Sequence, residues 1–302
     1  MSSKNLKFGK SIFLISILCL IILTGCEQQK ELDYFAESLE NINNQMDVYL
    51  SNINTDLYNY NLNHGFDRLV NLAFITNTYL TNMKNIENEL KKDMNSFEEL
   101  TSVFLNAESE SNLNKLSESQ KIILDEIHSK IDDYADNKNK LEDCLNNMNS
   151  YHIWTELIKE KISLQEKYEN EEALTVLNVE NEKYYEALKK LDESQKTLRD
   201  LKQVEIKINN TGIQKYSKEE LQEYDQLIEI EEIYRELIML LLQEKYYEAE
   251  LKNEEYLKKY YDFITNTPSF SHSIYTELDS IENWYSENIG VCLKIFEKYY
   301  KR

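Results

Sequence analysis

Glycine and proline are nearly absent from this chain. Its 302 residues include five glycines and one proline, whereas these residues ordinarily make up about 7% and 5% of a protein. Tight turns in β-sheets and α/β folds need the backbone angles that glycine and proline supply. The sequence therefore predicts an all-α fold of a few long helices. The residues left to interrupt it after position 25 are Gly65, Gly212, Pro268 and Gly290.

Two seams of apolar residues with a seven-residue spacing follow residue 31. The first consists of Leu32, Leu39, Met46, Ile53 and Tyr60, with Phe35, Ile42 and Tyr49 three residues after the first three. The second runs through Leu69, Met83, Leu90, Phe97 and Phe104, with Leu72, Tyr79, Ile86 and Leu100 as partners. Such seams are typical of coiled coils, and Gly65 between them is a typical helix stop. Residues 32–108 are therefore predicted to form a long antiparallel hairpin in an elongated, coiled-coil-like bundle.

Two capping boxes mark the starts of later helices. In each, a serine precedes Gln or Glu by three residues, so that side chains and backbone amides can satisfy one another. Ser117 with Gln120 begins a region of central long helices over 117–208, with a kink or an end predicted near 146–150. Ser217 with Glu220 begins a C-terminal helical region over 217–302, whose first helix is predicted to continue to about Thr265.

One six-residue segment occurs twice in the chain. Glu182–Ala187 has the sequence EKYYEA, which recurs at Glu244–Ala249, 62 residues later. The run around Tyr185 resembles the second helix of a tetratricopeptide repeat, but the Leu-Gly pair and the closing proline of that motif are missing. The spacing is also not a multiple of the 34-residue period. We therefore interpret the recurrence as a coincidence between two helices rich in Glu, Lys and Tyr.

The N-terminus has the pattern of an export signal. Lys4, Lys7 and Lys10 precede an apolar stretch from Ile12 to Leu23, which is typical of a secretory signal peptide and shorter than the roughly 20 residues of a membrane span. Leu23-Thr24-Gly25-Cys26 closes this stretch and resembles the prokaryotic lipobox. The alternative is an uncleaved signal anchor.

The lipobox resemblance implies where the mature chain begins and how it is held. Cleavage between Gly25 and Cys26 is expected to remove 1–25, and a diacylglycerol on Cys26 would anchor the protein to the cell membrane on its extracytoplasmic face. Residues 26–31 would then be a short lipidated tether. The layout is similar to that of cell-wall-associated coiled-coil lipoproteins of low-GC bacteria.

The charge of the chain excludes one class of partner. The formal net charge is −21, and loss of the three leader lysines leaves about −24 on the mature chain. A nucleic-acid binder needs clustered Lys and Arg to neutralise phosphates. No nucleic-acid partner is therefore expected, and the lipid is the expected contact with the membrane.

Two cysteines remain in the mature chain besides Cys26. Cys144 and Cys292 could form a disulfide in an oxidising compartment, but a single distant pair has no spacing pattern that could be tested. We favour two buried free thiols over a disulfide on sequence alone.

The sequence contains no recognisable arrangement of catalytic or metal-binding residues. The four histidines, His64, His128, His152 and His272, are scattered. Asp125 and His128 have the spacing of one half of a di-metal site, which needs two Glu-x-x-His motifs and two further glutamates. We interpret this pair as surface residues, and Trp154 and Trp284 as core residues. No enzyme activity, metal or cofactor is predicted.

These observations favour a non-enzymatic surface lipoprotein that acts as a helical scaffold or binds an envelope protein. The seams could close within one chain or between copies, so a homo-oligomer is also considered. Two alternatives remain. A solute-binding lipoprotein of a transporter would need a two-lobed α/β fold, and an envelope enzyme would need a catalytic site.

Overall fold

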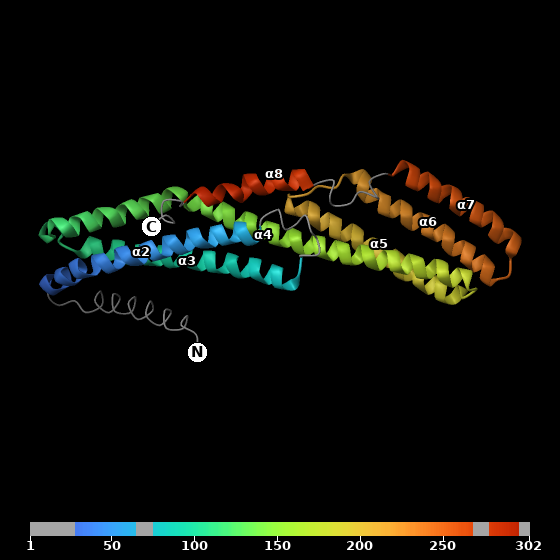
Figure 1. Cartoon of the computed structure of the whole chain (residues 1–302), viewed down its shortest axis with the longest axis horizontal. Coiled ribbons are helices and arrows are strands. Elements are labelled where there is room, and N and C mark those ends of the chain that lie inside the picture. Colours follow the sequence, from blue (N-terminus) through green and yellow to red (C-terminus); the bar gives the residue numbers. More distant parts are fainter. Residues whose placement is uncertain (1–27, 65–74, 268–277, 296–302) are drawn as a thin grey trace. The chain divides into compact units, whose positions relative to one another are not determined.

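The computed structural model describes residues 28–64, 75–267 and 278–295, and every regular element in these ranges is a helix (Figure 1). The all-α prediction is confirmed for this part of the chain. The elements are α2 (Gln28–His64), α3 (Asn77–Glu110), η3 (Leu113–Lys115), α4 (Glu118–Glu180), α5 (Tyr184–Thr211), α6 (Lys218–Leu242), α7 (Tyr246–Asn266), α8 (Leu278–Asn288) and η6 (Gly290–Lys294).

The helices form two compact units. Among the described residues, the first unit comprises 28–64, 81–148 and 288–295, and the second comprises 75–80, 149–267 and 278–287. The boundary lies inside α4, which contributes its first half to one unit and its second half to the other. This division differs from the predicted segments 32–108, 117–208 and 217–302, because those were read from helix ends.

In the first unit, α2, α3 and the first half of α4 pack around the predicted seams. Contacts join Phe35 to Phe104 (ring centroids 6.1 Å apart) and Asn43 to Glu126 (2.9 Å). Tyr60 donates a hydrogen bond to the Met148 carbonyl (3.1 Å). The residue numbers of the contacting positions therefore increase in the same direction along α2 and α4, so these two helices are parallel. Since Phe104 lies opposite the start of α2, α3 runs antiparallel to it.

The first seam is buried as predicted, except at one position. The apolar side chains of α2 with at most 4% exposure are Phe35, Leu39, Ile42, Met46, Leu50, Ile53, Leu57 and Tyr60. Leu50 takes the core position predicted for Tyr49, which is only half-buried. An α-helix has 3.6 rather than 3.5 residues per turn, so a straight helix moves out of a strict heptad. Leu32, Leu69 and Leu72 are seam residues whose side chains lie outside the described set.

The predicted helix starts are confirmed at both capping boxes. Ser117 N–H donates to Gln120 Oε1 (2.9 Å), and Gln120 N–H donates to Ser117 Oγ (3.3 Å). Ser217 and Glu220 form the same reciprocal pair at the start of α6. The described part of the second seam lies on α3, which begins at Asn77.

The helix end that was predicted as one alternative near 146–150 is wrong. α4 continues through this cluster of polar residues for 63 residues in all. The second unit instead has turns that were not predicted, at 181–183 between α4 and α5 and at 243–245 between α6 and α7. The end of α5 is at the predicted loop, where Gly212 has a left-handed φ of 74° and its N–H donates to Asn209 O.

The repeated EKYYEA segment has the same conformation at both of its sites. Glu182 and Glu244 each have a φ of 59°, and the lysine after each one caps the next helix with a φ close to −90°. The alanine that ends each copy is buried: Ala187 is 0% exposed and Ala249 is 2% exposed. Both copies therefore close a helical hairpin, so the recurrence marks two equivalent turns and not only two helices of similar composition.

We expect glycine to stabilise both turns. A left-handed φ is strained for a residue with a Cβ, so Glu182→Gly and Glu244→Gly should each raise the free energy of unfolding by about 1 kcal/mol. Urea denaturation followed by circular dichroism measures this change. Glu186→Gly, in the exposed first turn of α5, is the matched control and should destabilise by a similar amount. Equal losses at all three positions would contradict the prediction.

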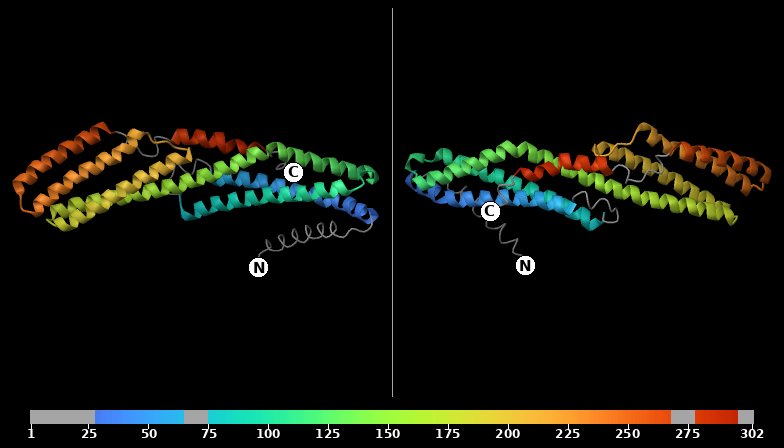
Figure 2. Two further views of the ribbon diagram at one scale, coloured as in Figure 1. Left: turned by 180° about the vertical axis from the view of Figure 1, so that it is seen from behind. Right: turned by 45° about the horizontal axis from the view of Figure 1, so that its top comes forward.

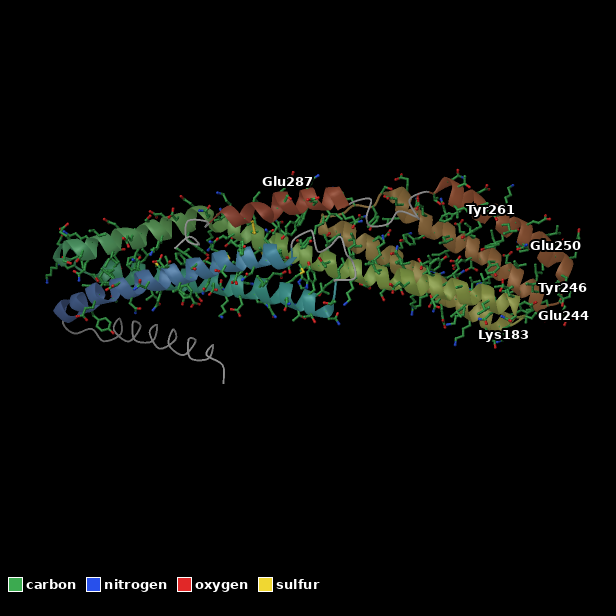
Figure 3. All side chains as sticks on the ribbon, viewed as in Figure 1. Lys183, Glu244, Tyr246, Glu250, Tyr261 and Glu287 are labelled. Carbon is green, nitrogen blue, oxygen red and sulfur yellow. A yellow bond between two sulfur atoms is a disulfide. The ribbon has the colours of Figure 1, made fainter. Side chains whose placement is uncertain are left out.

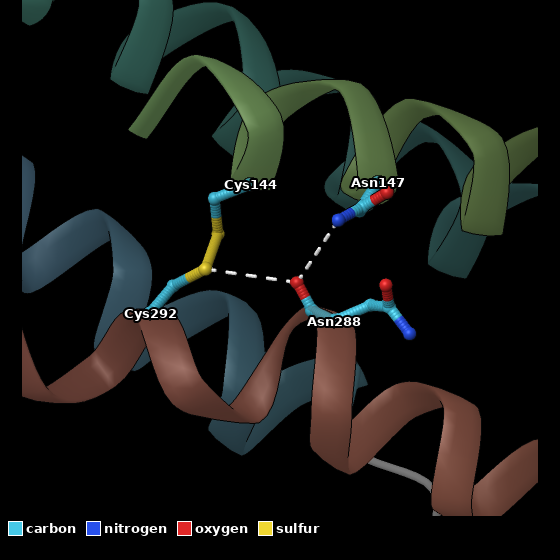
Figure 4. The surroundings of a disulfide bond; sticks show 4 residues. All are labelled: Cys144, Asn147, Asn288 and Cys292. Carbon is cyan, nitrogen blue, oxygen red and sulfur yellow. Dashed lines mark hydrogen bonds between the residues drawn. A yellow bond between two sulfur atoms is a disulfide. The ribbon is translucent and has the colours of Figure 1, made fainter. Parts of the chain in front are cut away.

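A disulfide joins Cys144 on α4 to Cys292 on η6, 148 residues apart in the sequence (Figure 4). The preference for free thiols is therefore wrong. Beside it, Asn147 Nδ2 donates to the Asn288 carbonyl (3.2 Å), and η6 also packs against α2. Both cysteines are buried. The bond fixes η6 to the helices of the first unit.

Candidate interaction surface

α5, α6 and α7 of the second unit lie side by side in sequence order (Figures 1 and 2). The apolar core between them contains Tyr168, Leu198, Leu201, Tyr224, Leu227, Ile230 and Phe263. Tyr234 of α6 stacks on Tyr256 of α7 (4.7 Å between centroids), and Tyr256 stacks on Tyr260 (5.8 Å). Lys252 of α7 also forms an ion pair with Glu236 of α6 (2.7 Å). One face of α7 is thus fixed against α6.

A buried ion pair holds α4 against α5. Lys161 Nζ lies 2.6 Å from Glu205 Oε1, and the side chains are only 12% and 5% exposed. Tyr224 of α6 donates its hydroxyl proton to the same Glu205 oxygen (2.7 Å), and Lys161 donates to the Tyr216 hydroxyl (2.9 Å). Burial, together with the negative Glu205, raises the pKa of Tyr224, which keeps this phenol protonated.

Breaking this pair should destabilise the second unit. Lys161→Met leaves the Glu205 carboxylate buried without its cation, which we expect to lower the free energy of unfolding by about 3 kcal/mol. The double variant Lys161→Met/Glu205→Gln should recover most of that loss, because a glutamine can still accept from Tyr224. Urea unfolding of both variants tests this, and a double variant no more stable than the single one would contradict it.

A second buried carboxylate, Glu231 of α6, faces α5. Ser194 Oγ donates to it at 3.1 Å, and Glu231 is 6% exposed. Burial raises its pKa from 4.5 to about 8, with a smaller contribution from the like charges of Glu172 and Glu232. Hydrogen bonds from Ser194 and Tyr168 act in the opposite direction. These buried polar groups contact other helices of the unit, so we assign them a role in stabilising the fold.

Asp125 and His128 have different surroundings on α4. His128 Nε2 pairs with Glu108 of α3 at 3.0 Å and its ring packs edge-on against Phe104, whereas Asp125 is exposed. Among the described residues no group of three or more His, Cys, Asp or Glu side chains could hold a metal ion. The remaining described histidine side chain, that of His152, pairs with Glu156 on its own helix. His128 thus connects α3 to α4, whereas His152 pairs within α4.

Trp154 is a core residue, as predicted. It is 1% exposed, its indole N–H donates to Gln214 Oε1 (3.1 Å), and its ring stacks on Tyr151. The ring of Trp284 on α8 stacks on the same Tyr151 (6.3 Å). Gly25, Cys26, Gly65 and His272 lie outside the described residues.

A shallow hollow of about 440 Å³ lies between α5 and α6. It is lined by Arg199, Lys202, Gln203, Asp225, Ile228 and Glu229. The Lys202 ammonium forms an ion pair with Asp225 across it (2.6 Å). Because the facing charges already neutralise one another, the hollow has no charge preference that would select a ligand.

Comparison with known proteins places the chain in no family. No family model matches it, and neither the curated proteins nor the solved structures contain a significant match. Among the helices that the structure describes, none is both long and apolar enough to cross a membrane.

The face of α7 directed away from α6 carries exposed apolar side chains. They are Tyr246 (64% exposed), Tyr247 (70%), Leu251 (51%), Leu257 (39%), Tyr261 (60%) and Ile264 (48%). Glu250, Glu254 and Lys258 lie among them and are exposed. We call these nine residues the α7 outer face, and Figure 3 labels three of them, Tyr246, Glu250 and Tyr261, along the helix.

An exposed apolar surface of this kind is typical of a protein interaction site rather than of a solvated helix. Tyrosine is also enriched at interfaces, because its ring buries a large apolar area and its hydroxyl can still find a partner. Sequence reasoning missed this face. A signal was present, since Tyr247, Glu254 and Tyr261 recur every seven residues and Leu257 and Ile264 follow the last two by three.

Proposed function

We propose that the mature chain is a non-enzymatic lipoprotein, anchored by a lipid on Cys26 to the extracytoplasmic face of the cell membrane, that serves as a helical scaffold and binds a protein partner. The observation that carries the binding role is the exposure of six apolar side chains on the α7 outer face. A partner helix or sheet laid along this face would remove them from water.

The disulfide supports the extracytoplasmic location. Cys144 and Cys292 form a bond that persists in oxidising compartments and is rare in a reducing cytosol. The proposed anchor agrees with this location, since the signal pattern at 1–25 would export the chain before the bond forms. α2 begins at Gln28, two positions after Cys26 and inside the predicted tether 26–31, so a lipid on Cys26 would hold the helices close to the bilayer.

The contacts of the buried charged groups in the second unit support a non-catalytic role, because these groups hold helices together. Lys161, Glu205 and Glu231 each bind residues of other helices. The solute-binding alternative requires a two-lobed α/β fold, whereas the described elements are helices only.

The anchor is tested by Cys26→Ala. The wild-type protein should sediment with membranes and partition into detergent, whereas the variant should be released or retained as an unprocessed precursor. Equal membrane association of a cleaved, unlipidated Cys26→Ala chain would contradict the lipid anchor.

The binding role is tested by capture from the solubilised native envelope. Tyr247→Ala and Tyr261→Ala should each lose partners that the wild-type protein retains. Tyr185→Ala is the matched control, because Tyr185 is equally exposed (74%) and occupies the position in the first EKYYEA copy that Tyr247 occupies in the second. Identical captured material for all three variants would contradict a role of the α7 outer face.

A further inference from the structure

We propose that the α7 outer face is covered by α7 of a second copy of this chain, in an antiparallel pair related by a two-fold axis. This proposal deepens the proposed function, on which it rests, by naming the partner of the same surface. It is carried by three properties of the described helices: the stacking of hairpins, the heptad spacing of the face, and the distribution of its charges.

The stacking of the second unit leaves α7 with one uncovered side. α6 packs on α5 and α7 packs on α6, and the two hairpin turns have the same backbone conformation. In arrays of stacked hairpins each element buries apolar surface against the next, and a terminal element normally has a polar outer side. α7 instead exposes Tyr247 and Tyr261 to at least 60%. Another helix laid on this side would continue the same packing.

The α7 outer face has the spacing of a coiled-coil seam. Tyr247, Glu254 and Tyr261 recur at seven-residue intervals, and Glu250, Leu257 and Ile264 follow them by three. This is the a/d pattern by which one helix packs along another. The occupant that fits best is therefore a helix with a similar seam, rather than an extended strand.

The charges of the face favour an antiparallel second copy. Glu250 and Glu254 lie in its N-terminal half and Lys258 lies toward its C-terminal end, and none of the three forms an ion pair with a described residue. In an antiparallel pair with Glu254 level with Leu257 of the second copy, Glu254 also lies beside the second copy's Lys258. The symmetry forms this contact twice.

In the same register, Tyr247 lies level with Ile264 of the second copy, and Glu250 lies level with its Tyr261. The tyrosine hydroxyl can then donate to the carboxylate, so the two acidic seam positions each gain a partner. A foreign helix would need to supply a cation and a hydroxyl at these same places, whereas this chain already carries both.

The pair should be weak. One helix per copy gives an interface at the lower end of the size range for specific complexes, and both copies are acidic. Ions screen that repulsion beyond about 8 Å at physiological salt. A concentration-dependent dimer is therefore expected in solution, which confinement to a membrane would favour.

Charge reversal tests the arrangement by sedimentation velocity, over concentrations up to about 0.5 mM, where weak dimers are populated. Glu254→Lys faces Lys258 of its second copy, and Lys258→Glu faces Glu254, so each variant alone should weaken the dimer at least tenfold. An equimolar mixture of the two should dimerise again, because every cross-pair is then attractive. Glu248→Lys and Lys259→Glu make the same charge changes off the face and should leave the dimer unchanged.

A wild-type protein that is monomeric throughout, or a mixture that does not recover association, would overturn the proposal. Circular dichroism and the melting temperature of each variant show whether it is folded, and the mixture uses the same two chains, so misfolding cannot produce the recovery. A monomer that still captures other proteins through Tyr247 and Tyr261 would leave the proposed function standing and reject only the second copy.

Discussion

Replacing Cys144 and Cys292 together by alanine is expected to lower the free energy of unfolding by about 5 kcal/mol. The bond closes a loop of 148 residues, and a crosslink across a loop of that length removes much of the conformational entropy of the unfolded chain. Alanine is the suitable replacement because both sites are buried and apolar. Urea unfolding at neutral pH, with and without a reductant, measures the loss.

The reductant separates the bond from the packing of the sulfur atoms. It should destabilise the wild-type protein by nearly the full amount and should have no effect on the double alanine variant. The released η6 should also exchange its amide hydrogens faster than the rest of the first unit. A wild-type protein whose unfolding is insensitive to the reductant would contradict a stabilising role for the disulfide.

The location of the disulfide illustrates what a sequence cannot provide. Cys144 lies on α4, whereas Cys292 lies near the C-terminus, and both belong to the first unit. The described residues of 149–287, which lie between them, belong to the second unit, so the proximity of the two cysteines depends on the tertiary fold. Local periodicity contains no information about such a contact. The class of fold, by contrast, follows from local properties, because a chain with five glycines and one proline has few ways to turn.

Helix starts could be predicted where a side chain caps the first turn of the helix. Ser117 and Ser217 bond to the backbone three residues later, and both helices begin as expected. The turns at Glu182 and Glu244 were missed because a left-handed residue there is normally glycine. Without glycine, the only signal was the repetition of EKYYEA itself, which marks two equivalent turns rather than an array with a fixed period.

The candidate surface was recognisable only in combination with the fold. α7 has apolar residues on two sides, and periodicity alone does not show which side α6 covers. Phe263 and Ala249 are buried while Tyr261 and Tyr247 are exposed, and this distinction depends on tertiary contacts. Buried pairs such as Lys161 and Glu205 were likewise hidden, because a charged residue on a helix is ordinarily solvated.

The second large effect is expected at Glu231 and depends on pH. Burial raises the pKa of this carboxyl from 4.5 to about 8. Between these two pH values the folded protein therefore keeps a proton on Glu231 that the unfolded chain has already released. The contribution of Glu231 to stability must therefore fall as the pH rises from about 4.5 to about 8. At about 1.4 kcal/mol per pKa unit, a shift from 4.5 to about 8 corresponds to a total loss of about 5 kcal/mol.

Glu231→Gln isolates this contribution from that of other titrating groups. One such group is Asp56 in the first unit, where burial and the charge of Asp93 raise the pKa to about 7. Its titration is present in both proteins and cancels in the difference between them. Glutamine keeps an oxygen that accepts from Ser194 and never becomes charged.

The variant should therefore match the wild-type protein near pH 4.5 and exceed its stability at pH 9. Urea unfolding across this range measures the difference, and Glu229→Gln, at an exposed position of the same helix, is the matched control for the loss of one carboxylate. A constant difference between Glu231→Gln and wild type at all pH values would mean that Glu231 is ionised in the folded protein throughout. Its charge would then be stabilised by the hydrogen bonds from Ser194 and Tyr168, and the buried α5–α6 contact would tolerate a carboxylate.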